Sequence, residues 1–67
     1  MISARNQIDG TVKSVKLGTI MAEVVAQVAG MELVSVITRS SAEAMSLKAG
    51  DRVRIVIKAT EVMVAKD

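Results

Sequence analysis

The amino-acid sequence predicts an all-β fold, a small antiparallel barrel with one short helix, and three observations predict it. First, β-branched residues dominate, with 11 Val, 6 Ile and 4 Thr among 67 residues, and such side chains are stiff and pack well on a pleated surface. Second, glycines and other turn residues divide the chain at short intervals. Third, residues 20–28 alternate with a period of two, as a half-buried strand does. The length predicts a single domain over residues 1–67.

The first two strands are separated by clear turn signals. Asp9-Gly10 predicts a turn or a bulge early in the first long strand, and Gly18-Thr19 predicts a tight hairpin turn. The next strand places one set of apolar side chains on a single face: Ile20, Ala22, Val24, Ala26 and Val28.

The third strand is predicted over Met31 to Thr38, after a turn at Ala29-Gly30. Both of its faces are largely apolar, because Val34 and Val36 oppose the set Met31, Leu33 and Ile37. A strand with two apolar faces is unusual in so short a chain. We therefore expect the second face to meet another subunit.

A short helix is predicted next. Ser40 fits the N-cap of a capping box with Glu43 three residues later, and we expect the helix to run through Leu47 and to end at Gly50. It is followed by a strand with Val53, Ile55 and Ile57 pointing inward, a break, and a last strand.

The break falls at Lys58-Ala59-Thr60, and Val62 and Val64 alternate in the last strand. Five strands with a helix between the third and the fourth match the plan of an OB-like five-stranded antiparallel barrel.

Composition excludes several classes of function. The chain is 51% hydrophobic, with a mean hydropathy of +0.43, so it is not a disordered tail. It has no Cys, His, Phe, Tyr or Trp, which excludes a disulfide framework, a Cys/His zinc site, Ser-His-Asp catalysis and aromatic stacking of bases. The carboxylates show no paired spacing for acid–base work, so we expect no enzyme.

The charge pattern and the apolar runs also limit the partners. A net charge of +2 from scattered basic residues argues against nucleic acid. No apolar run approaches the ~20 residues that span a bilayer, and Met1-Ile2 leads directly into polar residues, unlike a signal peptide. We therefore expect a cytoplasmic protein without a membrane partner.

Three polar clusters stand at predicted strand or helix ends, namely Ser3-Ala4-Arg5-Asn6, Thr38-Arg39-Ser40-Ser41 and Lys58-Ala59-Thr60. They offer hydroxyl groups, fixed cations and free backbone N–H groups, which are the donors that an oxyanion needs. From spacing alone, the favoured interpretation is that Ser40 and Ser41 only cap the helix and that Arg5 and Lys58 are only surface charges, rather than parts of an anion site. Spacing does not say whether the clusters meet.

The same residues resemble the molbindins, the small molybdenum-pterin-binding-type (Mop) proteins, which share a module with TOBE domains. The resemblance covers Ile2 to about Ala65 and is carried by Ser3-Ala4-Arg5-Asn6-Gln7, Gly10-Thr11-Val12, Gly18-Thr19-Ile20-Met21-Ala22-Glu23-Val24, Ile37-Thr38 with Ser41-Ala42-Glu43, and Ile57-Lys58-Ala59-Thr60-Glu61-Val62-Met63. The opening segment and the Ile57–Thr60 segment are specific at this separation.

The resemblance implies an OB-like barrel that exchanges a strand to form a dimer, with three dimers in a homo-hexamer. It implies binding of molybdate, and usually tungstate, at subunit interfaces for intracellular storage, without a cofactor. No metal would be ligated directly by the protein, since molybdenum enters only as molybdate. One subunit would contribute Ser3, Ala4, Arg5 and Asn6, and its partner Thr38, Ser41, Lys58, Ala59 and Thr60. A second oxyanion site is expected at the turn Gly18, Thr19, Ile20.

One departure and two alternatives accompany this resemblance. Arg39 adds a cation beside Thr38 that either strengthens or crowds the anion site. The main alternative is a molybdate-sensing module that signals oxyanion status to a partner protein. A nucleic-acid-binding OB barrel is the second alternative, and the missing aromatic residues argue against it.

Overall fold

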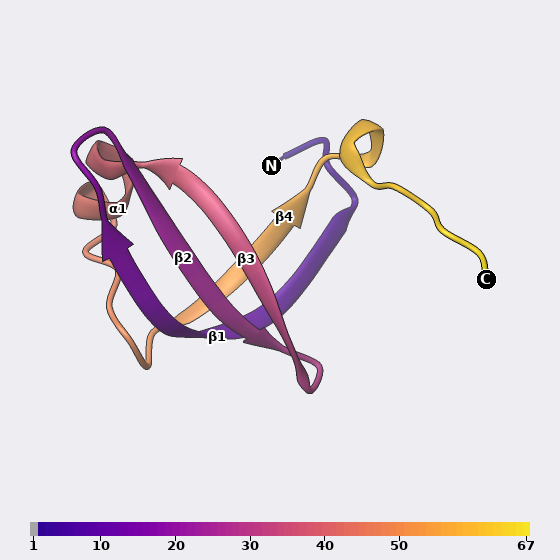
Figure 1. The fold of residues 1–67 in the computed structure, drawn as a ribbon, viewed down its shortest axis with the longest axis horizontal. Coiled ribbons are helices and arrows are strands. Elements are labelled where there is room, and N and C mark those ends of the chain that lie inside the picture. The colour runs from indigo at the N-terminus through magenta and orange to yellow at the C-terminus, as the bar shows by residue number, and fades with distance from the viewer. Residues whose placement is uncertain (1) are drawn as a thin grey trace.

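The computed structural model describes residues 2–67, which form one antiparallel sheet with a short helix and a 3-10 turn (Figure 1). The four strands lie in the order β3-β2-β1-β4. The elements in chain order are β1 (Asn6–Leu17), β2 (Met21–Val28), β3 (Met31–Thr38), α1 (Arg39–Ala44), β4 (Arg52–Ile57) and the 3-10 helix η1 (Ala59–Glu61).

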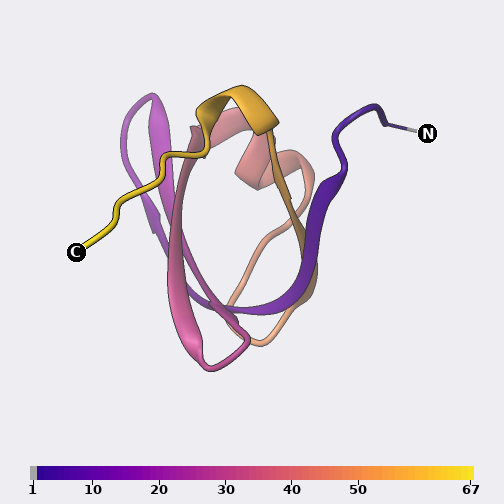
Figure 2. The same cartoon turned by 90° about the vertical axis from the view of Figure 1, so that its right-hand side faces the viewer.

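The long strand β1 joins the two halves of the sheet. Its first half pairs with β4, from Asn6 opposite Ile57, and its second half pairs with β2. The register with β2 shifts between Val12 and Ser14, and a bulge of this kind bends a strand. Figure 2 shows the result, because the curved β1 curls the sheet until β3 and β4 stand opposite each other.

Both predicted hairpin turns are confirmed. The turn after β1 closes with a hydrogen bond from Gly18 N to Met21 O of 2.7 Å. The turn between β2 and β3 has positive φ at both central residues, 49° at Ala29 and 79° at Gly30. Two-residue hairpins favour this backbone because its twist matches that of the flanking strands.

Among residues 2–67, the buried core consists of valine and alanine side chains. The buried residues are Val12, Ala22, Val24, Ala26, Val28 and Ala42, so the predicted inward face of β2 is confirmed from Ala22 onward. Ile20 is the exception, because β2 begins at Met21 and Ile20 lies in the preceding turn with 74% of its surface exposed.

The predicted limits of the helix are wrong at both ends. Thr38, not Ser40, is the N-cap, since its side-chain oxygen accepts a hydrogen bond from Ser41 N. The helix ends at Ala44, well before Gly50, and Ser46 reverses the chain with a φ of 51°. Thr38 takes the cap because β3 ends there in the extended conformation that an N-cap requires.

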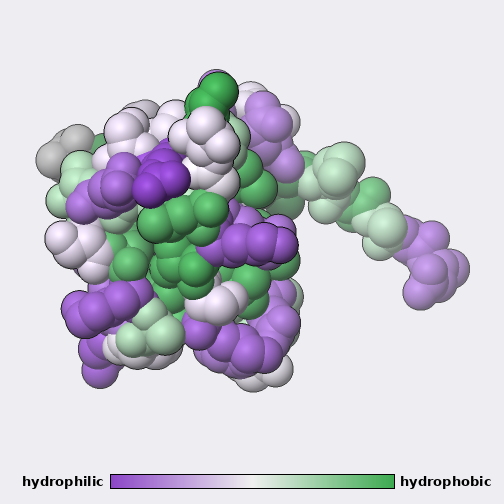
Figure 3. All heavy atoms as spheres, turned by 60° about the vertical axis from the view of Figure 1, so that its left-hand side comes forward, coloured by the Kyte–Doolittle hydropathy of each residue, from purple (hydrophilic) through white to green (hydrophobic). Residues whose placement is uncertain are grey.

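The predicted fifth strand is absent from residues 2–67 of this single chain. Residues 62–67 follow η1 as an extended segment without a strand partner (Figure 1), and Met63 and Val64 are each 93% exposed. Figure 3 shows this segment, called the C-terminal arm below, reaching away from the body. A strand needs a neighbouring edge for its hydrogen bonds, and the arm lies beside none of its own chain's edges.

Candidate functional site

Two of the three predicted polar clusters meet in one pocket. The pairing of Asn6 with Ile57 places the start of β1 beside the end of β4, so the residues before the one strand lie next to those after the other. The pocket has a volume of about 480 Å³ and is lined by Ser3, Ala4, Arg5, Asn6, Lys58, Ala59 and Thr60.

The pocket is rich in hydrogen-bond donors and has two cations. Among residues 2–67, neither Arg5 nor Lys58 takes part in an ion pair, and no carboxylate lines the pocket. A 3-10 turn uses the N–H of its fourth residue, and Glu61 N accordingly donates to Lys58 O at 2.9 Å. The N–H groups of Ala59 and Thr60 therefore remain outside the turn's own hydrogen bonds. An anion is the ligand that such a lining favours.

Gln7 supports the pocket, although it was not among the predicted site residues. Its Nε2 donates a hydrogen bond of 2.6 Å to Ala4 O, and its Oε1 accepts one of 3.5 Å from Arg54 Nη1. Gln7 and Arg54 are 47 residues apart in the sequence, and only the pairing of β1 with β4 brings them together. No local pattern could have indicated this contact.

The third predicted cluster lies at the opposite end of the molecule, around the start of α1 (Figure 1). The Thr38 hydroxyl donates to Ser41 Oγ at 2.8 Å and accepts from Ser40 Oγ at 3.3 Å and from Ser41 N at 3.2 Å. A single chain therefore keeps Thr38 and Ser41 apart from the pocket that holds Arg5 and Lys58.

Arg39 connects this cluster to the turn where the second oxyanion site was predicted. Its backbone N–H donates to Ile20 O at 2.7 Å, and its guanidinium donates to Gly18 O at 3.3 Å. The guanidinium also lies 3.4 Å from Glu43 Oε1. The Arg39 cation is thus engaged within its own chain, and the Gly18–Ile20 turn packs against α1. Whether this turn binds an oxyanion stays a prediction.

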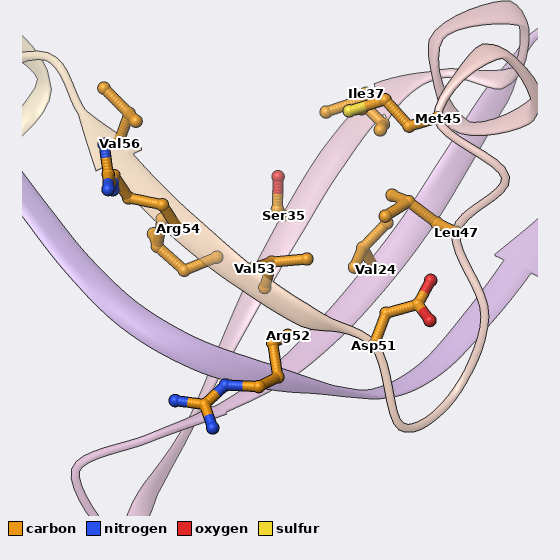
Figure 4. A pocket seen from close by; sticks show the side chains of 11 residues that line it. Val24, Ser35, Ile37, Met45, Leu47, Asp51, Arg52, Val53, Arg54 and Val56 are labelled. Carbon is orange, nitrogen blue, oxygen red and sulfur yellow. The ribbon is translucent and has the colours of Figure 1, made fainter.

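A second, mostly apolar pocket occupies the inner side of the curled sheet. Its volume is about 560 Å³, and side chains from β2, β3, β4 and the segment after α1 line it (Figure 4). At its rim, hydrogen bonds from the Lys48 ammonium and backbone N–H hold the pKa of Asp51 below its usual value. The apolar pocket follows β4 from Asp51 to Val56, and the cationic pocket lies beyond the end of that strand, at Lys58.

Two further classes of site are absent from the part of the chain that the structure describes. Residues 2–67 contain no cluster of three or more Cys, His, Asp or Glu side chains placed to hold a metal ion. None of the helices formed by these residues has the length and apolar character to cross a membrane.

Comparison with known proteins assigns the chain to a family. Residues 2–64 match the TOBE domain. Molybdenum-pterin-binding protein 3 of Clostridium pasteurianum is 47% identical over 64 residues, which cover 94% of each chain. The chain therefore belongs to the TOBE domain family and, within it, to the molbindin (Mop) proteins.

Solved structures agree with this assignment. A molybdate-binding protein from Sporomusa ovata superimposes with a TM-score of 0.95 at 44% identity, covering 98% of both chains. The cytoplasmic molybdate-binding protein ModG, solved with molybdate bound, superimposes with a TM-score of 0.83 at 44% identity. That match covers 87% of this chain and 42% of ModG. These relatives are described as binding proteins.

Proposed function

We propose that this chain binds molybdate, and tungstate in the same manner, in the pocket between Ser3–Asn6 and Lys58–Thr60, and leaves the oxyanion chemically unchanged. One observation carries the proposal. Among residues 2–67, the two cations of the pocket have no ion-pair partner and no carboxylate lines it, in a chain whose fold matches that of a molybdate-binding protein.

The chemistry of the ligand fits this lining. Molybdate is a tetrahedral dianion at neutral pH, so it accepts hydrogen bonds and donates none. Arg5 offers a planar fork of N–H donors and Lys58 a compact charge, while Ser3 and Thr60 add hydroxyl groups that can turn toward an oxygen. Phosphate carries a proton near neutral pH, and among residues 2–67 no carboxylate lines the pocket to accept it. We expect selection against the smaller sulfate to come from the size of the cavity.

We further propose that a second copy of the chain completes the site with Thr38 and Ser41. Within one chain these hydroxyls lie at the far end of the molecule from Arg5 and Lys58 (Figure 1), so they can reach the pocket only from another subunit. In this arrangement the Lys58–Thr60 segment acts from the same subunit as Arg5, because the two line one pocket. Binding would then take place at a subunit interface.

The assembly that we propose is a strand-exchanged dimer, with three dimers in a hexamer. Two features support exchange. The outer strands β3 and β4 each keep one free edge, and the C-terminal arm exposes Val62, Met63 and Val64. An arm that entered the apolar pocket of a neighbour would supply the missing fifth strand and cover apolar side chains on both copies.

For the biological role, we propose storage of the oxyanion in the cytoplasm. ModG, which is described as a cytoplasmic molybdate-binding protein, supports the location. A binder that releases its ligand unchanged suits a reserve, and equilibrium dialysis against molybdate, tungstate and sulfate would measure its capacity and its selectivity.

The pocket cations provide the direct test. We expect the wild-type chain to bind molybdate saturably at micromolar ligand, and Arg5→Ala and Lys58→Ala each to weaken binding by about tenfold or more, since a hydrogen bond to a charged group contributes about 1.5–3 kcal/mol. Isothermal titration calorimetry measures the affinity, and circular dichroism checks the fold.

Lys13→Ala is the matched control, because Lys13 is an exposed lysine of β1 that pairs with Glu32 at the surface and lines neither this pocket nor the apolar one. It should bind as the wild-type chain does. The proposal fails if the wild-type chain shows no saturable binding, or if both pocket variants bind molybdate as tightly as Lys13→Ala.

A further inference from the structure

The cationic pocket, proposed above as the oxyanion site and called the oxyanion pocket below, has Arg5 in one of its walls. This wall lies outside the sheet. Strand β1 begins at Asn6, so residues 3–5 have no partner strand. The hydrogen bond that anchors this segment is the one from Gln7 Nε2 to Ala4 O, at 2.6 Å. Ala4 is half-buried and adjoins Arg5, which is exposed, so the position of the Ala4 carbonyl sets where the arginine side chain starts.

The side-chain amide of Gln7 has one orientation that satisfies both neighbours. A guanidinium can only donate hydrogen bonds, and a backbone carbonyl can only accept them. Arg54 therefore takes the amide oxygen of Gln7, at 3.5 Å, and leaves its amino group for Ala4. Arg54 Nε also lies 3.9 Å from Asp9 Oδ1, on the next outward position of β1. Arg54 of β4 thus contacts Gln7, and Gln7 in turn contacts Ala4 in the wall of the pocket.

From this geometry we infer that Gln7 is a positioning residue for the oxyanion pocket, which holds the Arg5 segment opposite Lys58 through the Ala4 carbonyl. The inference rests on the proposed function, since it assigns Gln7 a role at that site. Gln7 does not line the pocket. Its effect on the ligand therefore passes through the placement of Arg5.

The test compares the same substitution, glutamine to methionine, at two positions. Gln7→Met keeps the length of the side chain and removes both hydrogen bonds. Gln27→Met makes the same change at an exposed glutamine of β2, whose side chain donates a long hydrogen bond of 3.5 Å to Glu32 Oε2. We expect Gln7→Met to raise the Kd for molybdate by about three- to tenfold, the range of one ordinary hydrogen bond. Gln27→Met should leave the Kd unchanged, and both variants should melt at a similar temperature without ligand.

A spectroscopic measurement separates positioning from general stability. In ligand-free protein, the {¹H}-¹⁵N NOE of the residue 3–5 amides should fall in Gln7→Met and stay at wild-type values in Gln27→Met, while the β2 amides stay rigid in both. Unchanged NOE values and an unchanged Kd in Gln7→Met would overturn the inference, as would a loss of binding that follows a general drop in melting temperature. If the wild-type chain does not bind molybdate, the proposed function fails, and the NOE comparison still decides whether Gln7 anchors the segment.

Discussion

Single residues at the centre of the sheet determine how closely its strands approach. Gly10 lies within β1, where a Cβ atom would come within 2.7 Å of Val28 Cγ2 and 2.8 Å of Gln27 O. The sequence marked Asp9-Gly10 as a turn or a bulge, because glycine indicates either one. The bulge lies a little further on, between Val12 and Ser14. Gly10 serves close packing instead, which only the register with the neighbouring strands reveals.

This close approach gives a prediction for Gly10→Ala. The added methyl group would have to displace a backbone oxygen and a stiff β-branched side chain, so we expect the free energy of unfolding to fall by about 1–3 kcal/mol. Urea unfolding at fixed protein concentration measures it. Adding Val28→Ala to the Gly10→Ala chain should recover less than the full loss of unfolding free energy, because Gln27 O would still meet the new methyl group. A Gly10→Ala chain as stable as the wild-type chain would contradict this account.

At the scale of elements, the sequence predicted well where an element depends on its own residues. The alternation along β2 and the turn residues at Gly18 and Gly30 depend on local geometry, and the structure confirms them. The helix start was misplaced because several hydroxyl residues follow one another from Thr38 to Ser41. Any of them can cap a helix, and the end of β3 decides which one does.

The cap assignment can be tested in ligand-free protein. Thr38→Ala removes the acceptor for Ser41 N, and we expect it to lower the free energy of unfolding by about 1 kcal/mol. Ser40→Ala is the control, since its hydroxyl only donates to Thr38 Oγ1 at 3.3 Å. It should cost clearly less, and Thr38→Ser should restore most of the stability. Equal losses for the two alanine variants, in urea unfolding at one protein concentration, would speak against Thr38 as the cap.

For the candidate site, too, the sequence predicted what depends on local residues and missed what depends on strand pairing. The polar clusters were visible in the sequence, and the pairing of β1 with β4 explains why two of them meet. The contact between Gln7 and Arg54 and the separation of Thr38 from Arg5 both depend on the order of strands in the sheet. Such long-range pairing is not encoded in any short motif, so spacing alone could not join the clusters.

At the scale of the whole molecule, a single chain leaves most of its large apolar side chains uncovered. In the described part of the chain, residues 2–67, the buried core contains valine and alanine, while Met31, Val34, Val36 and the apolar residues of the C-terminal arm are exposed. Figure 3 shows an apolar patch framed by hydrophilic residues on one face of the body. A domain of this size is marginally stable alone, and patches of this kind mark association surfaces. Assembly would therefore supply stability as well as the second half of the site.

The C-terminal arm makes assembly testable. We expect the wild-type chain to form a multimer at micromolar concentration, and Met63→Asp with Val64→Asp to yield a smaller species, because charges on the arm oppose its burial in a neighbour. Light scattering coupled to size-exclusion chromatography measures the mass. The same variant should bind molybdate more weakly, since Thr38 and Ser41 would no longer arrive from a second copy. Ser14→Asp with Ala29→Asp adds equal charge at exposed positions outside the apolar pocket and should leave both mass and affinity unchanged. A monomeric wild-type chain, or an arm variant with wild-type mass, would exclude strand exchange through this segment.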